Sequence, residues 1–147
     1  MKGIVLAAGK GTRLYPMTKP VCKPLLPVYD KPLIYYPIAT LLQAGIKDIL
    51  VIIPPGEEKE FTNLLGDGSE FGIHIEFAVQ KVARGIADAL IIGEDFIGDD
   101  SVCLVLGDNI FHCHNLDEIM KEAIKDDHGA KVFGYYVDDP RPFGVVE

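Results

Sequence analysis

The chain has 147 residues, with 14 Lys and Arg against 22 Asp and Glu, for a net charge of −8. This length suits one domain, because domains commonly have about 100–200 residues. The composition is 48% hydrophobic and 24% charged, which excludes collagen, low-complexity disorder and a disulfide-rich miniprotein. Its apolar runs are shorter than the ~20 residues needed to cross a bilayer.

The charge is unevenly distributed along the chain. Residues 1–53 carry seven cations and two acids, whereas residues 54–147 carry seven cations and twenty acids. The overall negative charge disfavours non-specific binding to nucleic acid or to an anionic membrane surface. We therefore expect the basic segment to contain a local site for a small anion.

The cysteines and the start of the chain indicate a reducing compartment. Cys22, Cys103 and Cys113 are odd in number and irregularly spaced, which does not suit a disulfide framework. The first apolar run, 4–8, is too short for a secretory signal. We expect a cytoplasmic protein.

Short apolar runs alternate with helical patterns along the sequence. In chain order we expect a strand over 4–8, a long ordered loop over 9–31, a helix over 32–44, a strand over 48–54, a helix over 57–65, a strand over 73–79, a helix over 85–92, a strand over 102–106, a helix over 116–125 and a strand over 130–137. This alternation predicts an α/β fold with a mostly parallel, Rossmann-like sheet and right-handed crossovers.

The last residues, 143–147, resemble the start of one more strand. We expect a single nucleotide-binding domain over 1–147, truncated at its C-terminus as part of a longer protein. A natural terminus that pairs at a sheet edge is the alternative.

The loop after the first strand has the composition of a phosphate site. Gly9, Gly11, Thr12 and Arg13 offer accessible backbone amides, a hydroxyl and a cation, which together suit a polyphosphate. The loop lacks the Walker A pattern, and Leu14 stands where the dinucleotide fingerprint has its third glycine. A simple turn is the alternative interpretation.

Three further residues follow strands or lie in proline-rich sequence. Lys23 lies among prolines that order its backbone, so it is either aimed at an anion or a solvated surface lysine. Asp108 follows a buried strand and could hold Mg²⁺ or close a turn. Gln80, with Gly85 after it, could meet a nucleobase, although polar loop residues are common.

Four segments, 6–14, 23–27, 29–37 and 106–111, carry a family resemblance. They resemble the sugar-1-phosphate nucleotidyltransferases, and the tyrosine-rich and Gly-Asp-Asn segments resemble the thymidylyl branch of that family. The resemblance extends over essentially the whole chain. It implies a three-layer α-β-α fold of the nucleotide-diphospho-sugar transferase type.

The resemblance also implies roles for individual residues. Arg13, Lys23 and Asp108 would be catalytic, with Asp108 holding Mg²⁺ as the cofactor. The sugar would contact Asn109 and Gly144. The nucleotide would contact Ala8, Gly9, Gly11, Thr12, Arg13, Lys23, Gln80 and Gly85.

The implied reaction transfers a thymidylyl group from dTTP to glucose 1-phosphate, giving dTDP-glucose and pyrophosphate, in a homotetramer when full length. The sequence departs from the family at Ala8, Pro24 and His112–Cys113. A uridylyl- or adenylyltransferase for another sugar 1-phosphate, or a non-catalytic nucleotide-sugar-binding protein, remains an alternative. A fragment of this length could bind nucleotide and lack activity, because the family's remaining sugar pocket lies beyond residue 147.

Overall fold

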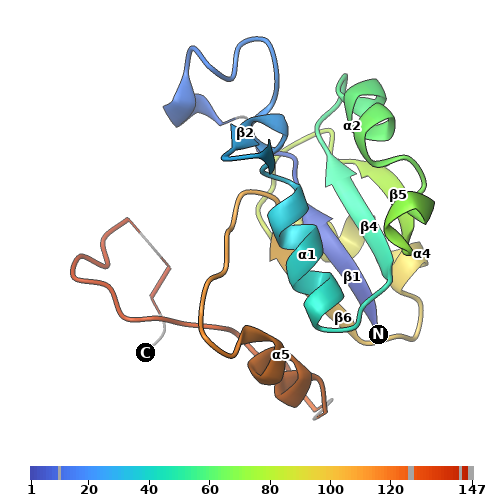
Figure 1. Ribbon diagram of the computed structural model, residues 1–147, viewed down its shortest axis with the longest axis vertical. Coiled ribbons are helices and arrows are strands. Elements are labelled where there is room, and N and C mark those ends of the chain that lie inside the picture. The colour runs from blue at the N-terminus through green and yellow to red at the C-terminus, as the bar shows by residue number, and fades with distance from the viewer. Residues whose placement is uncertain (10, 126–127, 143, 146–147) are drawn as a thin grey trace.

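A computed structural model describes residues 1–9, 11–125, 128–142 and 144–145. Its centre is a four-stranded parallel sheet with the strand order β5-β4-β1-β6 (Figure 1). The strands are β1 (Lys2–Leu6), β4 (Asp48–Ile53), β5 (His74–Val79) and β6 (Val102–Leu106). The predicted parallel α/β sheet is confirmed.

The strands are made of continuous apolar runs because both faces of the sheet are covered. Residues 49–53 of β4 are at most 3% exposed, and Ile4 and Val5 of β1 are fully buried. Continuous apolar sequence is typical of parallel strands buried on both faces. In β5, at one edge, His74 and Glu76 are exposed and Ile75 is buried, which accounts for its partly alternating sequence.

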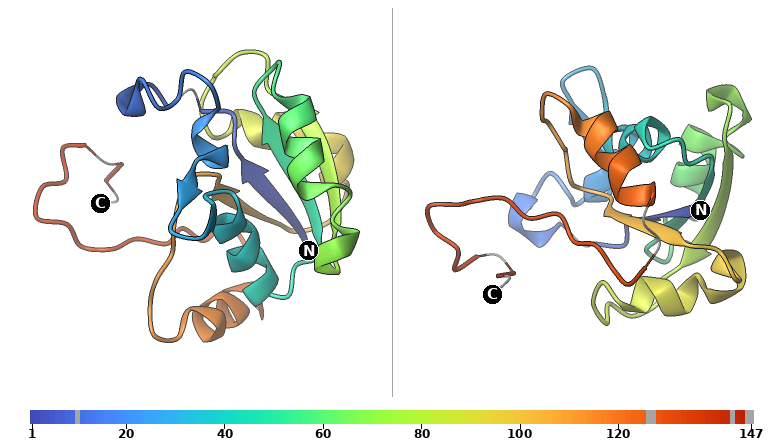
Figure 2. Two further views of the ribbon diagram at one scale, coloured as in Figure 1. Left: turned by 45° about the horizontal axis from the view of Figure 1, so that its top comes forward. Right: turned by 90° about the horizontal axis from the view of Figure 1, so that it is seen from below.

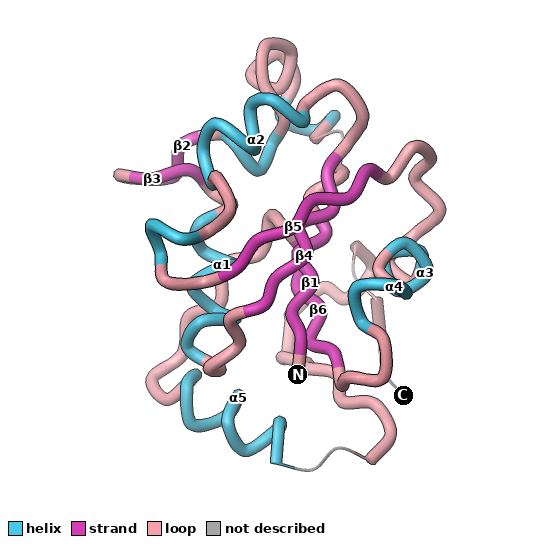
Figure 3. Tube along the Cα trace, turned by 90° about the vertical axis from the view of Figure 1, so that its right-hand side faces the viewer, coloured by secondary structure: helices cyan, strands magenta, loops and turns pink. Residues whose placement is uncertain are grey.

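Helices cover both faces of the sheet (Figure 3). On one face, α1 (Tyr35–Gln43) and α2 (Glu58–Leu65) contribute Ile38, Leu41 and Phe61 to the larger apolar cluster. On the other face, α3 (Asp88–Ile92) and α4 (Glu94–Ile97) pack against a smaller cluster. The expected three-layer arrangement is therefore present.

The long loop before α1 contains short regular pieces. Two 3₁₀ turns, η1 (Thr12–Leu14) and η2 (Lys23–Leu25), are followed by a hairpin of β2 (Pro27–Val28) and β3 (Lys31–Pro32). Because Lys31 and Pro32 pair with β2, α1 begins at Tyr35, later than predicted. A third 3₁₀ turn, η3 (Ser69–Phe71), precedes β5.

The structure corrects the prediction of a strand over 130–137. After α5 (Leu116–Lys125), the described residues 128–142 contain no strand, and the chain extends away from the sheet (Figures 1 and 2). Val132, Tyr135 and Tyr136 are 81%, 77% and 105% exposed. A strand needs a neighbouring strand to pair with its backbone groups, and the sheets of the described part of the chain do not include this segment. Phe143, Val146 and Glu147 lie outside the described residues.

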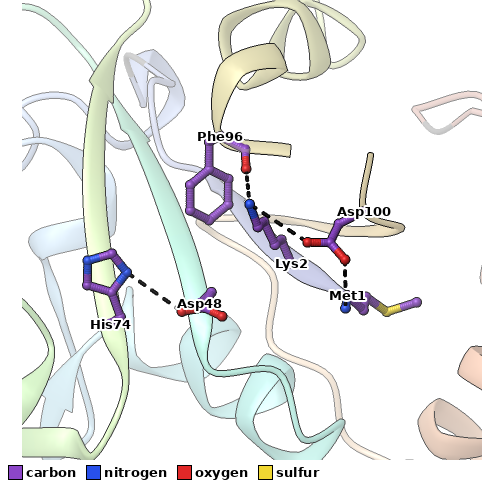
Figure 4. A network of polar contacts seen from close by, with 6 residues as sticks. All are labelled: Met1, Lys2, Asp48, His74, Phe96 and Asp100. Atoms are coloured by element: carbon purple, nitrogen blue, oxygen red, sulfur yellow. Dashed lines mark hydrogen bonds and ion pairs between the residues drawn. The ribbon is translucent and has the colours of Figure 1, made fainter. Parts of the chain in front are cut away.

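Polar contacts fix the amino ends of the strands (Figure 4). The Met1 amino group lies 3.6 Å from the Asp100 carboxylate, and Lys2 Nζ donates to the Phe96 carbonyl. These contacts tie β1 to α4 and to the loop before β6, at the end of the sheet remote from the carboxyl ends.

Every helix within the described ranges is too short or too polar to span a lipid bilayer.

Candidate functional site

A cavity of about 260 Å³ opens at the carboxyl ends of the parallel strands. Chain segments after β1, β5 and β6 meet there with η2, as expected for ligand sites in open α/β sheets. The lining residues are Leu6, Ala7, Ala8, Gly9, Lys23, Pro24, Gln80, Ala83, Gly85, Ile86, Leu106, Gly107 and Asp108.

Gly107 lets the segment after β6 lie against the segment after β1. Its N–H donates to the Leu6 carbonyl at 2.8 Å. A Cβ at this position would lie 2.8 Å from Ala7 Cα, closer than such contacts allow. The absence of a side chain at Gly107 therefore allows Asp108 to line the same cavity as Ala8 and Gly9.

Gly11 similarly lets the loop after β1 lie close to η2. Its φ of 58° favours glycine, and a Cβ there would lie 2.8 Å from Lys23 Cβ. The Thr18 hydroxyl donates to the Gly11 carbonyl at 3.1 Å. The glycine turn thus packs against the residue that supplies the cavity's cation. Gly9, by contrast, has open space around its Cβ position.

The Lys23 ammonium and the Asp108 carboxylate form an ion pair at the cavity. Lys23 Nζ donates to Asp108 Oδ2 at 2.6 Å, across 85 residues of sequence. The side chains are 31% and 39% exposed, so a ligand can reach both. One group can bind an anion and the other a cation, as a metal-bound polyphosphate requires.

The residues around Asp108 fit a Mg²⁺ ion held mainly by substrate. Mg²⁺ commonly uses one or two protein carboxylates together with phosphate oxygens and water. Asp108 supplies one such carboxylate, and the described residues contain no cluster of three potential metal-ligating side chains. Among the described residues, Asp108 would therefore hold the ion together with a phosphate-bearing ligand.

Gln80 is part of a polar network that the sequence did not reveal. Gln80 Nε2 donates to Asp88 Oδ2 at 2.9 Å, and Arg84 Nη2 lies 3.0 Å from Asp88 Oδ1. Gln80 and Asp88 are 6% and 5% exposed. The signal for Asp88 was an acid between alanines in the apolar run Ile86–Ile92, because buried acids require partners.

Cys22, immediately before Lys23, is a packing residue. It is 7% exposed and belongs to the larger apolar cluster. Burial raises the pKa of its thiol to about 12, with the charge of Glu57 contributing. A thiol in this state is a poor nucleophile at neutral pH. Because Cys22 packs in the larger apolar cluster, it anchors the segment that carries Lys23.

The structure gathers some of the expected site residues and leaves others apart. Ala8, Gly9, Lys23, Gln80, Gly85 and Asp108 border the cavity. Gly11, Thr12 and Arg13 lie farther along the loop, with Thr12 and Arg13 exposed in η1. Asn109 borders a second hollow, along β6, and Gly144 is exposed and borders neither.

Comparison with known proteins identifies relatives of this chain. The chain is 59% identical over 147 residues to glucose-1-phosphate thymidylyltransferase of Neisseria gonorrhoeae, covering 51% of that protein. It is 56% identical over 146 residues to the enzyme of the same name from Xanthomonas campestris, covering 50% of it. The chain spans about half the length of the curated relatives it matches.

Solved structures show the same fold. A crystal structure assigned as a glucose-1-phosphate thymidylyltransferase from Bacillus anthracis, in complex with sucrose, matches with a TM-score of 0.91 and 45% identity, covering 99% of this chain and 58% of that one. A UDP-glucose pyrophosphorylase bound to UDP-glucose matches with a TM-score of 0.67 and 26% identity, covering 84% and 52%. The sequence model of the nucleotidyl transferase family matches residues 2–147, and the chain belongs to this family.

Proposed function

We propose that the protein transfers a thymidylyl group from dTTP to glucose 1-phosphate, giving dTDP-glucose and pyrophosphate. The observation that carries the proposal is the cavity, where the Ala8–Gly9 backbone, Lys23, Gln80 and Asp108 meet. The names and high identity of the relatives support the choice of dTTP and glucose 1-phosphate.

The candidate residues divide into those that bind the phosphates, those that meet the base and those that contact the sugar. The Ala8–Gly9 backbone and Lys23 bind the phosphates, and Gln80 and Gly85 meet the base. Arg13 and Thr12 act from the loop that Gly11 packs against Lys23. Asn109 and Gly144 are proposed to contact the sugar.

The reaction needs charge screening more than it needs a base. A phosphate monoester is largely ionised at pH 7, so a sugar-phosphate oxygen can attack the α-phosphorus directly. The new P–O bond forms as the bond to pyrophosphate breaks. Lys23 reduces the repulsion between the two anions and stabilises charge on the departing pyrophosphate. Mg²⁺ held by Asp108 would supply further charge neutralisation when bound.

The proposal extends to assembly and location. We propose a homotetramer for the full-length protein, in line with the family resemblance. We also propose a cytoplasmic location, since the cysteines Cys22, Cys103 and Cys113 are free and reduced thiols are typical of that compartment.

The test measures nucleotide binding and pyrophosphate release separately. The chain is titrated with dTTP, UTP, ATP and dTDP-glucose in the presence of Mg²⁺, and pyrophosphate release is assayed with glucose 1-phosphate in the full-length protein. The proposal expects dTTP to bind most tightly and to release pyrophosphate. Preference for UTP or ATP would instead indicate a related transferase, and dTDP-glucose binding without any release would indicate a nucleotide-sugar-binding protein.

Lys23 provides a matched mutational test of the same site. Lys23→Met should weaken dTTP binding by about tenfold or more, because a charge-assisted hydrogen bond contributes about 1.5–3 kcal/mol. Lys19→Met is the control, since Lys19 is exposed on the same loop and does not border the cavity. Equal losses in the two variants would remove Lys23 from the site.

A further inference from the structure

A buried carboxylate that the proposed mechanism does not use holds the Gln80 side chain. Asp88 Oδ2 accepts a hydrogen bond from Gln80 Nε2 at 2.9 Å. Asp88 Oδ1 lies 3.0 Å from Arg84 Nη2, and the Asp88 side chain is 4% exposed against 67% for Arg84. Each carboxylate oxygen therefore has its own donor, and Asp88 is fixed between an amide and a guanidinium.

This contact determines the orientation of the Gln80 amide. A carboxylate paired with a guanidinium has only acceptors, so the NH₂ group of Gln80 must face it. The oxygen and nitrogen of a glutamine amide have nearly the same shape, and the hydrogen-bond partners decide which is which. With Nε2 facing Asp88, Oε1 faces away from Asp88.

The remaining Gln80 oxygen is available to a ligand. No described residue donates a hydrogen bond to Gln80 Oε1. Among the described residues, every fully buried side-chain nitrogen or oxygen has a hydrogen-bond partner, so Oε1 must be accessible to solvent. Gln80 is one of the residues that line the cavity, and an accessible oxygen on such a residue can accept a hydrogen bond from the cavity's occupant.

We propose that Asp88 is a positioning residue that fixes Gln80 as an acceptor and thereby selects the nucleobase. Thymine and uracil carry an N–H at ring position 3, which can donate to Oε1. Cytosine has an acceptor at that ring position, which would face Oε1 with no proton between them. The inference rests on the proposed function, in which Gln80 meets the base. A site built around one hydrogen bond rejects an analogue that leaves its buried group unpaired.

Substitution of Asp88 by asparagine tests the proposal with little change in shape. An asparagine offers both a donor and an acceptor, so Gln80 can lie in either orientation. The measurement is the ratio of the dissociation constants of dCTP and dUTP, two nucleotides that both lack the thymine methyl group. The parent should prefer dUTP, and in Asp88→Asn the ratio should fall about tenfold, the scale of one hydrogen bond, largely through tighter dCTP binding.

Lys81→Gln is the matched control, because Lys81 is exposed on the same loop and its loss keeps both the Gln80–Asp88 hydrogen bond and the Arg84–Asp88 ion pair. Its ratio should stay within about twofold of the parent's, since an exposed charge next to the site contributes little to it. An unchanged ratio in Asp88→Asn would overturn the proposal. Equal binding of dUTP and dCTP by the parent would also overturn it and leave the triphosphate site intact. Binding of neither nucleotide would contradict the proposed function itself.

A second measurement uses the unsubstituted chain, in case Asp88→Asn does not fold. The side-chain NH₂ signals of Gln80 in an NMR spectrum should exchange slowly with solvent, because Gln80 is 6% exposed and its Nε2 is bonded to Asp88. Rapid exchange in the folded parent would contradict the fixed orientation.

Discussion

At the scale of single residues, the Lys23–Asp108 ion pair joins the candidate phosphate-binding cation to the candidate Mg²⁺-binding carboxylate. The pair, at 2.6 Å, holds the cation of the loop segment against the acid that follows β6. Both side chains are partly exposed, so a Mg²⁺–triphosphate complex can reach them. The triphosphate would then replace Asp108 as the partner of Lys23, and Mg²⁺ would replace Lys23 as the partner of Asp108. Without that complex, each side chain neutralises the other.

Asp108→Asn should change how nucleotide binding depends on magnesium. In the absence of Mg²⁺, dTTP should bind more tightly than to the parent, because a negative charge leaves the cavity and Lys23 is released. With Mg²⁺ present, the gain in affinity that the metal gives the parent should shrink about tenfold, as expected for the loss of a charged ligand. Titrations of dTTP with and without Mg²⁺ measure both effects, and identical metal dependence in variant and parent would refute the assignment of Asp108.

Glu57 lies where burial and like charges oppose its ionisation. Partial burial raises the pKa of its carboxyl, and the charges of Glu60 and Glu58 raise it further. The folded state therefore disfavours the ionised form relative to the unfolded chain. This cost is present at neutral pH and vanishes when pH falls below the ordinary carboxyl range.

Glu57→Gln should accordingly stabilise the protein at pH 7 and have no effect at low pH. We expect a gain of about 0.2–0.5 kcal/mol, the scale of a like-charge pair on a helix, disappearing below about pH 4. Urea unfolding at both pH values measures the difference. Glu76→Gln, on the exposed face of β5, is the control, and an equal gain at both pH values would contradict the charge explanation.

At the scale of elements, the site depends on how closely the segments after β1 and β6 approach each other. Gly107 allows this approach, since a Cβ would meet Ala7 Cα and Cβ at 2.8 Å and the Leu6 carbonyl at 3.1 Å. Backbone atoms on neighbouring strands cannot move aside cheaply. The contact therefore holds the position of Asp108.

Gly107→Ala should destabilise the fold by about 1–3 kcal/mol, the usual cost of overpacking, and should also weaken dTTP binding. Gly134→Ala is the control, because a Cβ there meets nothing within 4 Å. Thermal unfolding of both variants gives the comparison. A Gly107→Ala protein as stable as the control would show that the two segments are not held in close contact.

The helices and strands were predictable where the residue pattern itself shows which side chains are buried. β4 is a run of apolar residues buried on both faces, and its sequence was enough to place it in a parallel sheet. The prediction over 130–137 was wrong because strand propensity does not supply a pairing partner. α4, which was not predicted, follows directly on Gly93 after α3 and is too short to leave a periodic pattern.

The site was predictable to the extent that topology determines it. Parallel strands end at one edge of the sheet, so the sequence placed Gln80 and Asp108 near the glycine loop. The partners of these side chains were not predictable. The ion pair of Lys23 with Asp108 and the contact of Gln80 with Asp88 depend on loop paths across 85 and 8 residues, which no local pattern records.

At the scale of the whole molecule, the two ends of the sheet differ in chemistry. The amino ends carry the Met1–Asp100 and Lys2–Phe96 contacts (Figure 4), which are structural. The carboxyl ends carry the cavity, with Lys23 and Asp108 at its border. The family membership and the sheet topology both favour the carboxyl end as the place where nucleotide binds.

The most direct test of this account follows the backbone amide signals of the isotopically labelled chain by NMR while dTTP and Mg²⁺ are added. The account predicts saturable shifts at Gly9, Lys23, Gln80 and Gly85, with the amides of Lys2 and Asp100 unchanged. Shifts confined to the Lys2–Asp100 end of the sheet, or no shifts at saturating dTTP, would contradict it.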